Sequence, residues 1–382
     1  MDGITRAMMN LIGSEVCGTE ADSGLYTALS DEEKIGLYRL SKKHDLAHIV
    51  GNALINGNLL SEGKLKETYQ NEVFTAVYRY ETLAYELEEL RRVFNEAKIP
   101  FIPLKGSVIR RYYPEPWMRT SCDIDILVHE KDLERATKAI QDALGYSFEG
   151  RHYHDVSLFS QSGVHLELHF HLRETMENID GLLTRAWEFA KEKEDYEYEF
   201  LNEFLLFHIY AHASYHFAGG GCGVRTFLDL FLLNKKVKCD SEKLDGFLEE
   251  AKIKKFAEEA ENLAETWFGK REYTELTKEI EEYVLHGGVY GTLENRVAVE
   301  QAKKGKIGYA LSRIWLSYKS LKCLYPSLEK HKWLLPFYEI RRWFSLLFDG
   351  GVKRGANELK VNANLSDEKK QAAKNLIDEL GL

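Results

Sequence analysis

Two short segments near the middle of the chain alternate apolar and polar residues, with carboxylates at polar positions. The first is residues 121–128, Ser-Cys-Asp-Ile-Asp-Ile-Leu-Val, and the second is residues 164–170, Val-His-Leu-Glu-Leu-His-Phe. Because successive side chains of a strand point to opposite faces of a sheet, this period predicts two half-buried strands. Asp123 and Asp125 then share one face of the first strand, and Glu167 lies on the polar face of the second.

If these two strands are neighbours, the three carboxylates converge. Like charges held close together raise the pKa of one of the carboxyl groups unless a cation lies among them. Carboxylate oxygens are the ligands that Mg²⁺ and Mn²⁺ prefer. The sequence therefore predicts a divalent metal site, suited to phosphoryl or nucleotidyl chemistry, at Asp123, Asp125 and Glu167.

The segments around these strands predict an α+β protein. Residues 1 to about 97 have helical periodicity throughout, and Ile99–Leu104 is a short strand-like run. Residues 156–160 and 164–171 flank Gln-Ser-Gly, which is typical of a β-hairpin. From about residue 175 onward the pattern indicates helices only.

We accordingly expect a small mixed-sheet module flanked by N-terminal and C-terminal helical domains. The expected division is an N-terminal helical region over 1–70, a catalytic module over 71–175 and a C-terminal helical domain over 176–382. The aromatic and basic stretch over 333–348 is expected to be a buried helix of the last domain. A helix lying on a membrane surface is its alternative.

The amino-acid composition limits which classes of protein the chain can belong to. The chain has 382 residues, of which 44% are hydrophobic and 29% charged, as in ordinary soluble domains. No apolar run approaches the roughly 18 residues of a transmembrane segment, and no signal peptide is evident, so we expect a cytoplasmic protein. Five scattered cysteines favour reduced thiols. The net charge of −10 disfavours a broad nucleic-acid surface.

A second motif precedes the carboxylates. Lys105-Gly106-Ser107 follows the short strand-like run and precedes a short helix, so that it offers backbone N–H groups, a hydroxyl and a helix N-terminus to an anion. Asp-Ile-Asp follows sixteen residues after Ser107. This combination resembles the Gly-Ser and Asp-x-Asp signature of the polymerase-β-like nucleotidyltransferases.

The resemblance is closer to a bacterial family of uncharacterised nucleotidyltransferases. That family is typified by Leu-Lys-Gly, Tyr-Pro-x-Pro, Arg-x-x-x-Asp-Ile-Asp-x-Leu-Val and an acidic-Leu-His strand. The corresponding segments here are 104–106, 113–116, 119–128 and 167–169, and the similarity extends to the earlier helices and to Arg225-x-x-x-Asp229.

The resemblance implies a mechanism with residue roles. Asp123 and Asp125 would hold two Mg²⁺ (or Mn²⁺) ions that bridge the phosphates of an NTP, and Glu167 would bind a metal or accept the proton of the acceptor hydroxyl. Two such ions activate the nucleophile and neutralise pyrophosphate in an in-line displacement at the α-phosphate.

Other residues are predicted to bind the nucleotide. Gly106 and Ser107 would hold the terminal phosphates, with Lys105 or Arg119 adding positive charge. The possible pocket residues are His169, His212, Arg225 and Asp229. Arg225 and Asp229 are one helical turn apart and can also pair with each other. Arg119 can likewise form a structural ion pair with Glu115 or with one of the two strand aspartates.

The histidines leave alternatives open. His165, His169 and His171 flank Glu167, which would also suit a His-carboxylate metallophosphatase that binds zinc or iron. His208, His212 and His216 recur every fourth residue and are expected to pack at a helix interface. A catalytically silent relative that binds a nucleotide or a protein is a further alternative.

The negative charge favours a small-molecule or protein acceptor over a long nucleic acid, although a tRNA end stays open. The sequence does not indicate which NTP is used or which oligomeric state the chain adopts.

Overall fold

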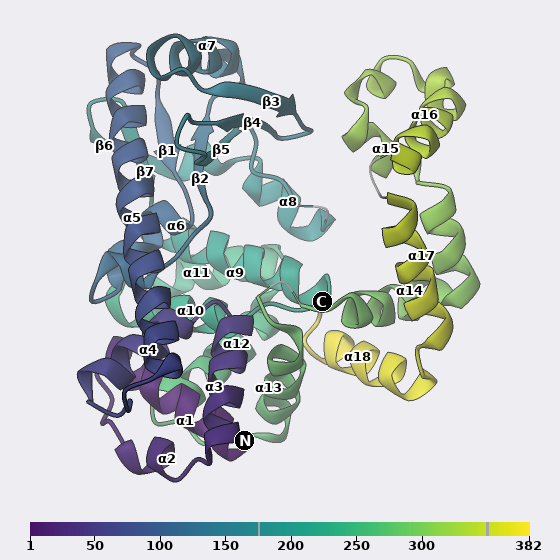
Figure 1. Cartoon of the computed structure of the whole chain (residues 1–382). Helices are drawn as coiled ribbons and strands as arrows, with labels where there is room; N and C mark the ends of the chain where they lie inside the picture. The colour runs from purple at the N-terminus through teal and green to yellow at the C-terminus, as the bar shows by residue number, and fades with distance from the viewer. Residues whose placement is uncertain (175, 290, 349–350) are drawn as a thin grey trace.

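The computed structural model of the protein describes residues 1–382 apart from 175, 290, 349 and 350 (Figure 1). The helices up to the end of the sheet are α1 (Gly3–Ile12), α2 (Ser23–Thr27), α3 (Asp31–Lys43), α4 (Ala47–Asn56), α5 (Lys64–Glu96), α6 (Gly106–Ile109), α7 (Leu133–Leu144) and α8 (Glu177–Leu183). The later helices are α9 (Asn202–Ala218), α10 (Val224–Lys236), α11 (Ser241–Glu250), α12 (Lys254–Phe268), α13 (Glu275–Gly287), α14 (Leu293–Ile314), α15 (Tyr318–Leu324), α16 (Leu335–Phe348), α17 (Gly351–Asn364) and α18 (Asp367–Glu379).

The described strands form one mixed sheet of seven, in the order β3-β4-β5-β2-β1-β7-β6. They are β1 (Phe101–Pro103), β2 (Asp123–Val128), β3 (Ser147–Arg151), β4 (Asp155–Phe159), β5 (His165–His169), β6 (Ala190–Glu194) and β7 (Glu197–Phe200). β2 is parallel to β5 and antiparallel to β1, whereas β4 and β5 form an antiparallel hairpin. The predicted hairpin and the two alternating strands are therefore present.

Helices α5 and α7 cover one face of the sheet. Ile124, Ile126 and Val128 of β2 are buried against this layer together with Leu166 and Leu168 of β5. Because side chains alternate along a strand, this burial turns the odd-numbered residues of both strands to the other face. That face is directed towards the part of the core that contains α9 and α10, so the hydrophobic period itself sets where the carboxylates point.

The expected α+β class is confirmed, because a small mixed sheet lies among helices before and after it. The expectation of helices only after residue 175 is wrong, since β6 and β7 add a hairpin to the sheet edge. β6 is Ala-Lys-Glu-Lys-Glu, an exposed edge strand without an apolar face, and for that reason it carries no period-2 hydrophobic signal. The three-part domain division stays a prediction, although the sheet expected within residues 71–175 extends to Phe200.

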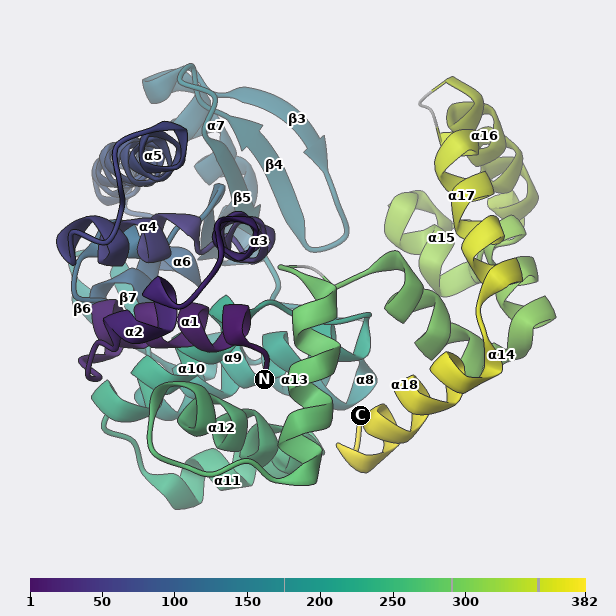
Figure 2. The same ribbon diagram turned by 60° about the horizontal axis from the view of Figure 1, so that its bottom comes forward.

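The helices α14–α17 form a lobe that stands beside the rest of the molecule in both views (Figures 1 and 2). We call α14–α17 the C-terminal lobe. α18 returns from it, and Ala373, Leu376 and Ile377 join the main core. Among the described helices, none is both long enough and apolar enough to cross a membrane.

The aromatic stretch that was expected to be a buried helix lies in the C-terminal lobe. The structure contradicts this burial over the residues that it describes. Trp333 is 76% exposed, and Phe337 and Phe344 are each 59% exposed. Arg342, by contrast, is buried and pairs with Glu339 at 2.9 Å.

Candidate functional site

The three predicted carboxylates lie together on the face of the sheet opposite α5 and α7. In the parallel pairing of β2 with β5, Asp125 lies directly beside Glu167, and Asp123 lies beside His165. Two groups of possible metal ligands result, and the ligand atoms within each group lie within 4.8 Å of one another. One consists of Asp123, His165 and Glu167, and the other consists of Asp125, Glu167 and His169. Glu167 therefore belongs to both.

Two cationic side chains contact Asp125, which is buried. Lys105 Nζ donates a hydrogen bond to Asp125 Oδ1 at 2.9 Å, and His169 Nε2 lies 2.9 Å from the same oxygen. His169 Nε2 also lies 3.4 Å from Glu167 Oε2. One imidazole thus links the carboxylates of both strands, while its buried Nδ1 has no hydrogen-bond partner among the described residues.

The pKa values follow from burial and from these contacts. Burial alone would raise the pKa of Asp125. The charge of Lys105 and the hydrogen bond with His169 lower it by a larger amount, so the pKa of Asp125 lies below its ordinary value. Burial, with the charges of Asp125 and Glu167, raises the pKa of Asp123. The His169 hydrogen bond lowers the pKa of Glu167. Although burial opposes it, hydrogen bonding to Asp125 and Glu167 raises the pKa of His169 to about 8.

Lys105 reaches Asp125 from an unusual backbone conformation. Its φ of 44° is positive, which is strained for a residue other than glycine. The next residue, Gly106, packs so closely on Ser121 that a Cβ would lie 3.0 Å from the Ser121 side chain. The Ser107 N–H donates to Leu104 O within the turn, at 3.1 Å. The predicted anion loop is therefore a tight turn with a strained lysine at its start.

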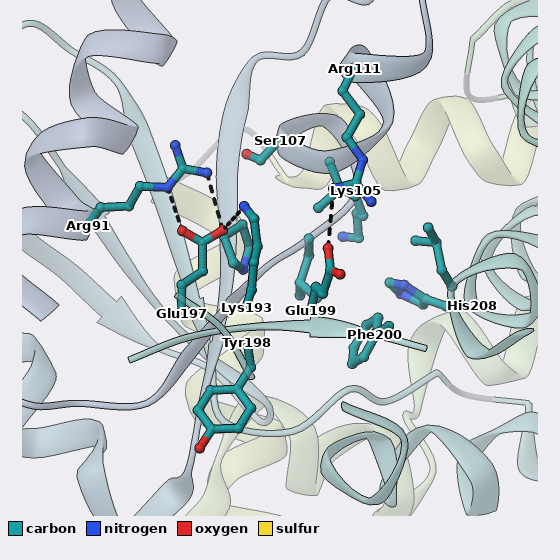
Figure 3. A pocket seen from close by; sticks show the side chains of 14 residues that line it. Arg91, Lys105, Ser107, Arg111, Lys193, Glu197, Tyr198, Glu199, Phe200 and His208 are labelled. Atoms are coloured by element: carbon teal, nitrogen blue, oxygen red, sulfur yellow. Dashed lines mark hydrogen bonds and ion pairs between the residues drawn. The ribbon is translucent and has the colours of Figure 1, made fainter. Parts of the chain in front are cut away.

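A cavity of about 170 Å³ adjoins Lys105 between the α6 turn, β7 and α9 (Figure 3). Its charged and polar lining includes Arg91, Lys105, Ser107, Arg111, Lys193, Glu197, Glu199 and His208. Arg91 and Lys193 both pair with Glu197, at 2.8 and 2.7 Å, and Arg111 pairs with Glu199. The His208 ring points into the cavity, and its buried Nδ1 has no partner among the described residues.

Arg119 and Asp229 form an ion pair with each other. Arg119 Nε donates to both Asp229 oxygens, at 2.8 and 2.9 Å, and Tyr113 Oη donates to Asp229 Oδ1 at 2.7 Å. The predicted pairing of Arg225 with Asp229 is not observed. Arg225 pairs with Asp45 at 2.6 Å instead. These contacts join α10 to the loop before β2, and they leave Arg119 at the edge of the site with its charge balanced.

No sequence motif pointed to Glu174, which the structure places near the carboxylates, Lys105 and His169. His212 Nδ1 of α9 lies 3.2 Å from Glu174 Oε1. Burial raises the pKa of Glu174, and the positive charges of His216 and Lys105 oppose this shift. Since 38 residues separate His212 from Glu174, no local pattern could have paired them. His212 thus faces a polar group, while packing of the α9 histidines at a helix interface stays a prediction.

Comparison with known proteins adds one finding. A family model described as an uncharacterised nucleotidyltransferase matches residues 31–269, more than half of the chain. The matched range contains every residue of the site described above. This match confirms the resemblance drawn from the sequence motifs. No curated protein matches the chain.

Proposed function

The chain belongs to the uncharacterised nucleotidyltransferase family, and from this we propose that it is a metal-dependent enzyme that moves a nucleoside monophosphate from an NTP to a hydroxyl or phosphate acceptor. The observation that carries the proposal is the pair of three-ligand groups that share Glu167. Two such groups, assembled from adjacent parallel strands, match the requirement of a two-metal displacement.

The residues fit divalent ions. Asp123, Asp125 and Glu167 supply hard oxygen ligands, as Mg²⁺ and Mn²⁺ require. Burial and repulsion from Asp125 and Glu167 raise the pKa of Asp123, and a bound cation would relieve this repulsion. These three residues would hold the ions, which would polarise the α-phosphate and neutralise the leaving pyrophosphate.

The neighbouring side chains would position the carboxylates and the phosphates. His169 holds Asp125 and Glu167 in register across the two strands. Lys105, with its strained backbone, pairs with Asp125 and also lines the cavity, and Ser107 lines the same cavity. Both positions support the proposal that Lys105, Gly106 and Ser107 bind the terminal phosphates. Arg119 as a phosphate ligand stays a prediction, since its guanidinium is paired with Asp229.

A base is required to take the proton of an acceptor hydroxyl. Glu167 is the base that the resemblance implies, but the His169 hydrogen bond lowers its pKa and weakens it as a base. The pKa of Glu174 is instead raised, by burial, which makes its carboxylate a stronger base. We propose Glu174 as a second candidate for this role, with His212 orienting its carboxylate. The chain's net charge of −10 favours a small-molecule or protein acceptor.

One observation favours a second candidate function. Each three-ligand group contains an imidazole, of His165 in one and His169 in the other, and such mixed sets suit zinc or iron. A His-carboxylate metallophosphatase would purify with one of these metals. Elemental analysis of the purified protein separates the two candidates, because a nucleotidyltransferase with loosely held Mg²⁺ would contain neither in stoichiometric amount.

The test is a thermal-shift comparison of ATP, GTP, CTP and UTP with and without Mg²⁺ or Mn²⁺. A ligand that binds only the native state raises the melting temperature with the logarithm of its concentration over its dissociation constant. We expect a shift with at least one NTP, only with metal, and its loss in Asp125→Asn. The exposed aspartate of the Lys138–Asp142 pair supplies a matched control, Asp142→Asn, which should shift like the wild type.

Two outcomes would contradict the proposal. One is a metal-dependent shift that Asp125→Asn retains in full, and the other is the lack of any shift with all four nucleotides. Pyrophosphate release then separates an enzyme from a silent relative, since a silent relative would bind an NTP with metal yet release no pyrophosphate with any acceptor.

A further inference from the structure

The second half of α14 exposes a stripe of large apolar side chains. The helix is kinked at Gly305, where φ is 70°. Beyond the kink Ile307 and Leu311 are one helical turn apart, and Trp315 directly follows the last residue of the helix; they are 77%, 58% and 57% exposed. Residues with this spacing lie on one face of a helix. An apolar face of this kind normally packs against another element, and here it meets solvent.

A second exposed stripe runs along α16 and the turn before it. Trp333, Phe337, Ile340 and Phe344 follow one another at intervals of four, three and four residues, and each is more than half exposed. Large apolar side chains that are exposed together along one helix face mark an interaction surface. The two stripes therefore require a partner.

The same part of the chain is strongly basic. Residues 303–344 contain ten Lys or Arg and two Asp or Glu, although the whole chain has a net charge of −10. One of these two acids, Glu339, is buried and paired with Arg342. The exposed cations are Lys303, Lys304, Lys306, Arg313, Lys330, Lys332 and Arg341.

Some cations lie beside aromatic rings from neighbouring segments of the C-terminal lobe. Lys332 Nζ is 5.5 Å from the ring centre of Tyr318, and the Arg341 guanidinium is 5.7 Å from that of Tyr325. Long basic side chains that cover aromatic surface while keeping their charge in water are typical of a membrane interface. Apolar stripes bordered by Lys and Arg on short amphipathic helices have the composition of helices that lie in the headgroup region.

We propose that the C-terminal lobe docks on an anionic lipid surface, with the α14 and α16 stripes entering the headgroup region and the exposed cations contacting the acidic lipids. A nucleic acid would satisfy the cations but leaves no role for aliphatic side chains such as Ile307, Leu311 and Ile340. A second copy that docked through the same lobe would bring two basic surfaces together, which their charges oppose. The inference does not depend on the proposed transferase activity.

The test is flotation of the full-length protein with lipid vesicles at about 0.1 M salt. We expect binding to phosphatidylcholine vesicles that contain about a third phosphatidylglycerol, and little binding to pure phosphatidylcholine. The triple variant Trp333→Ser, Phe337→Ser, Phe344→Ser should weaken vesicle binding at least tenfold, because binding scales with the buried apolar area. The triple variant Lys330→Gln, Lys332→Gln, Arg341→Gln should weaken it by on the order of a hundredfold.

Helix α5 offers a matched control. Phe74, Tyr78 and Tyr85 are 70%, 66% and 66% exposed, so their triple serine variant removes as many exposed aromatic rings from another surface. We expect it to bind vesicles like the wild type. Circular dichroism spectra of all variants verify that they are folded, as expected for substitutions at exposed positions.

Four results would overturn the proposal. The first is a wild type that does not float with the anionic vesicles, and the second is an α5 control that loses as much binding as the α16 variant. The third is binding of a labelled RNA oligonucleotide that the charge variant abolishes and the aromatic variant leaves intact, without vesicle binding. A dimer in sedimentation velocity that the aromatic variant dissociates would assign the surface to a second copy instead.

Discussion

At the scale of single residues, Lys105 and His169 hold the buried carboxylate of the site in place. Asp125 is 4% exposed, and it contacts both Lys105 and His169 at 2.9 Å. A buried carboxylate without a partner would be costly, because desolvation disfavours its charged form. Lys105 and His169 therefore maintain Asp125 as a carboxylate, the form that a metal site requires.

Removing the lysine should expose this dependence. Lys105→Gln leaves the Asp125 charge with His169 alone, and we expect the free energy of unfolding to fall by about 3 kcal/mol, since one partner of a buried pair is lost. Urea denaturation in EDTA measures the change. Lys138→Gln, at an exposed ion pair with Asp142, should change it by less than about 0.5 kcal/mol. Equal effects of the two variants would show that the Lys105 contact adds no stability.

The protonation of His169 should make stability depend on pH. Its pKa is raised to about 8 in the folded protein, above the ordinary value of about 6.5 in an unfolded chain. Folding thus favours the protonated form of His169. Its contribution to the free energy of unfolding, about 2 kcal/mol, is complete below pH 6.5 and is lost as the pH rises through 8. Urea denaturation of the wild type and His169→Gln in EDTA, at pH 6 and pH 9.5, tests this.

The difference in stability between wild type and His169→Gln should shrink by about 2 kcal/mol from the lower to the higher pH. Other titrating groups are common to both proteins and cancel in this difference. A difference that stays constant across the range, or grows with pH, would contradict the assigned protonation of His169.

At the scale of elements, the strands that carry the carboxylates are those that the sequence could predict. β2 and β5 each bury one face, and burial imposes the alternation that identifies a strand. β6 lacks this signal because it is an exposed edge strand. Residues 196–200, Tyr-Glu-Tyr-Glu-Phe, do alternate between polar and apolar, so the sequence could have indicated β7. The two-residue turn Asp195-Tyr196, with Asp195 at a φ of 49°, is a further signal of this hairpin.

The ion pairs between α10 and the loop before β2 belong to the same scale. Arg119 and Asp229 are both largely buried, and Tyr113 shares the Asp229 carboxylate. Asp229→Asn would leave the Arg119 charge without its counterion, so we expect the free energy of unfolding to fall by roughly 3 kcal/mol. The exposed Asp142→Asn should have almost no effect. Chemical denaturation measures both, and an unaffected Asp229→Asn would mean that Arg119 finds other partners.

At the scale of the whole molecule, contacts between distant segments complete the site. The sequence predicted Asp123, Asp125 and Glu167, because each lies in a local pattern. It could not pair Arg225 with Asp45 across 180 residues, since sequence spacing alone suggested Asp229. The cationic cavity beside Lys105 was equally beyond prediction, because it depends on β7.

The C-terminal lobe shows a different limit of sequence reasoning. An amphipathic aromatic helix has the same period whether its apolar face is buried or exposed, so the pattern over 333–348 could not decide between the two.

The C-terminal lobe also contacts the sheet module, because Lys322 of α15 lies 5.3 Å from the ring centre of Tyr153, in the loop between β3 and β4. A docked lobe would thus hold the sheet module close to the lipid surface.

Mn²⁺ binding followed by electron paramagnetic resonance measures whether Asp123, Asp125 and Glu167 share divalent ions. Titration of the protein with Mn²⁺ in the presence of ATP gives the number of bound ions and their affinity. We predict that Asp125→Asn and Glu167→Gln each weaken binding at least tenfold, while Asp142→Asn binds like the wild type. Wild-type affinity in both site variants would contradict the claim.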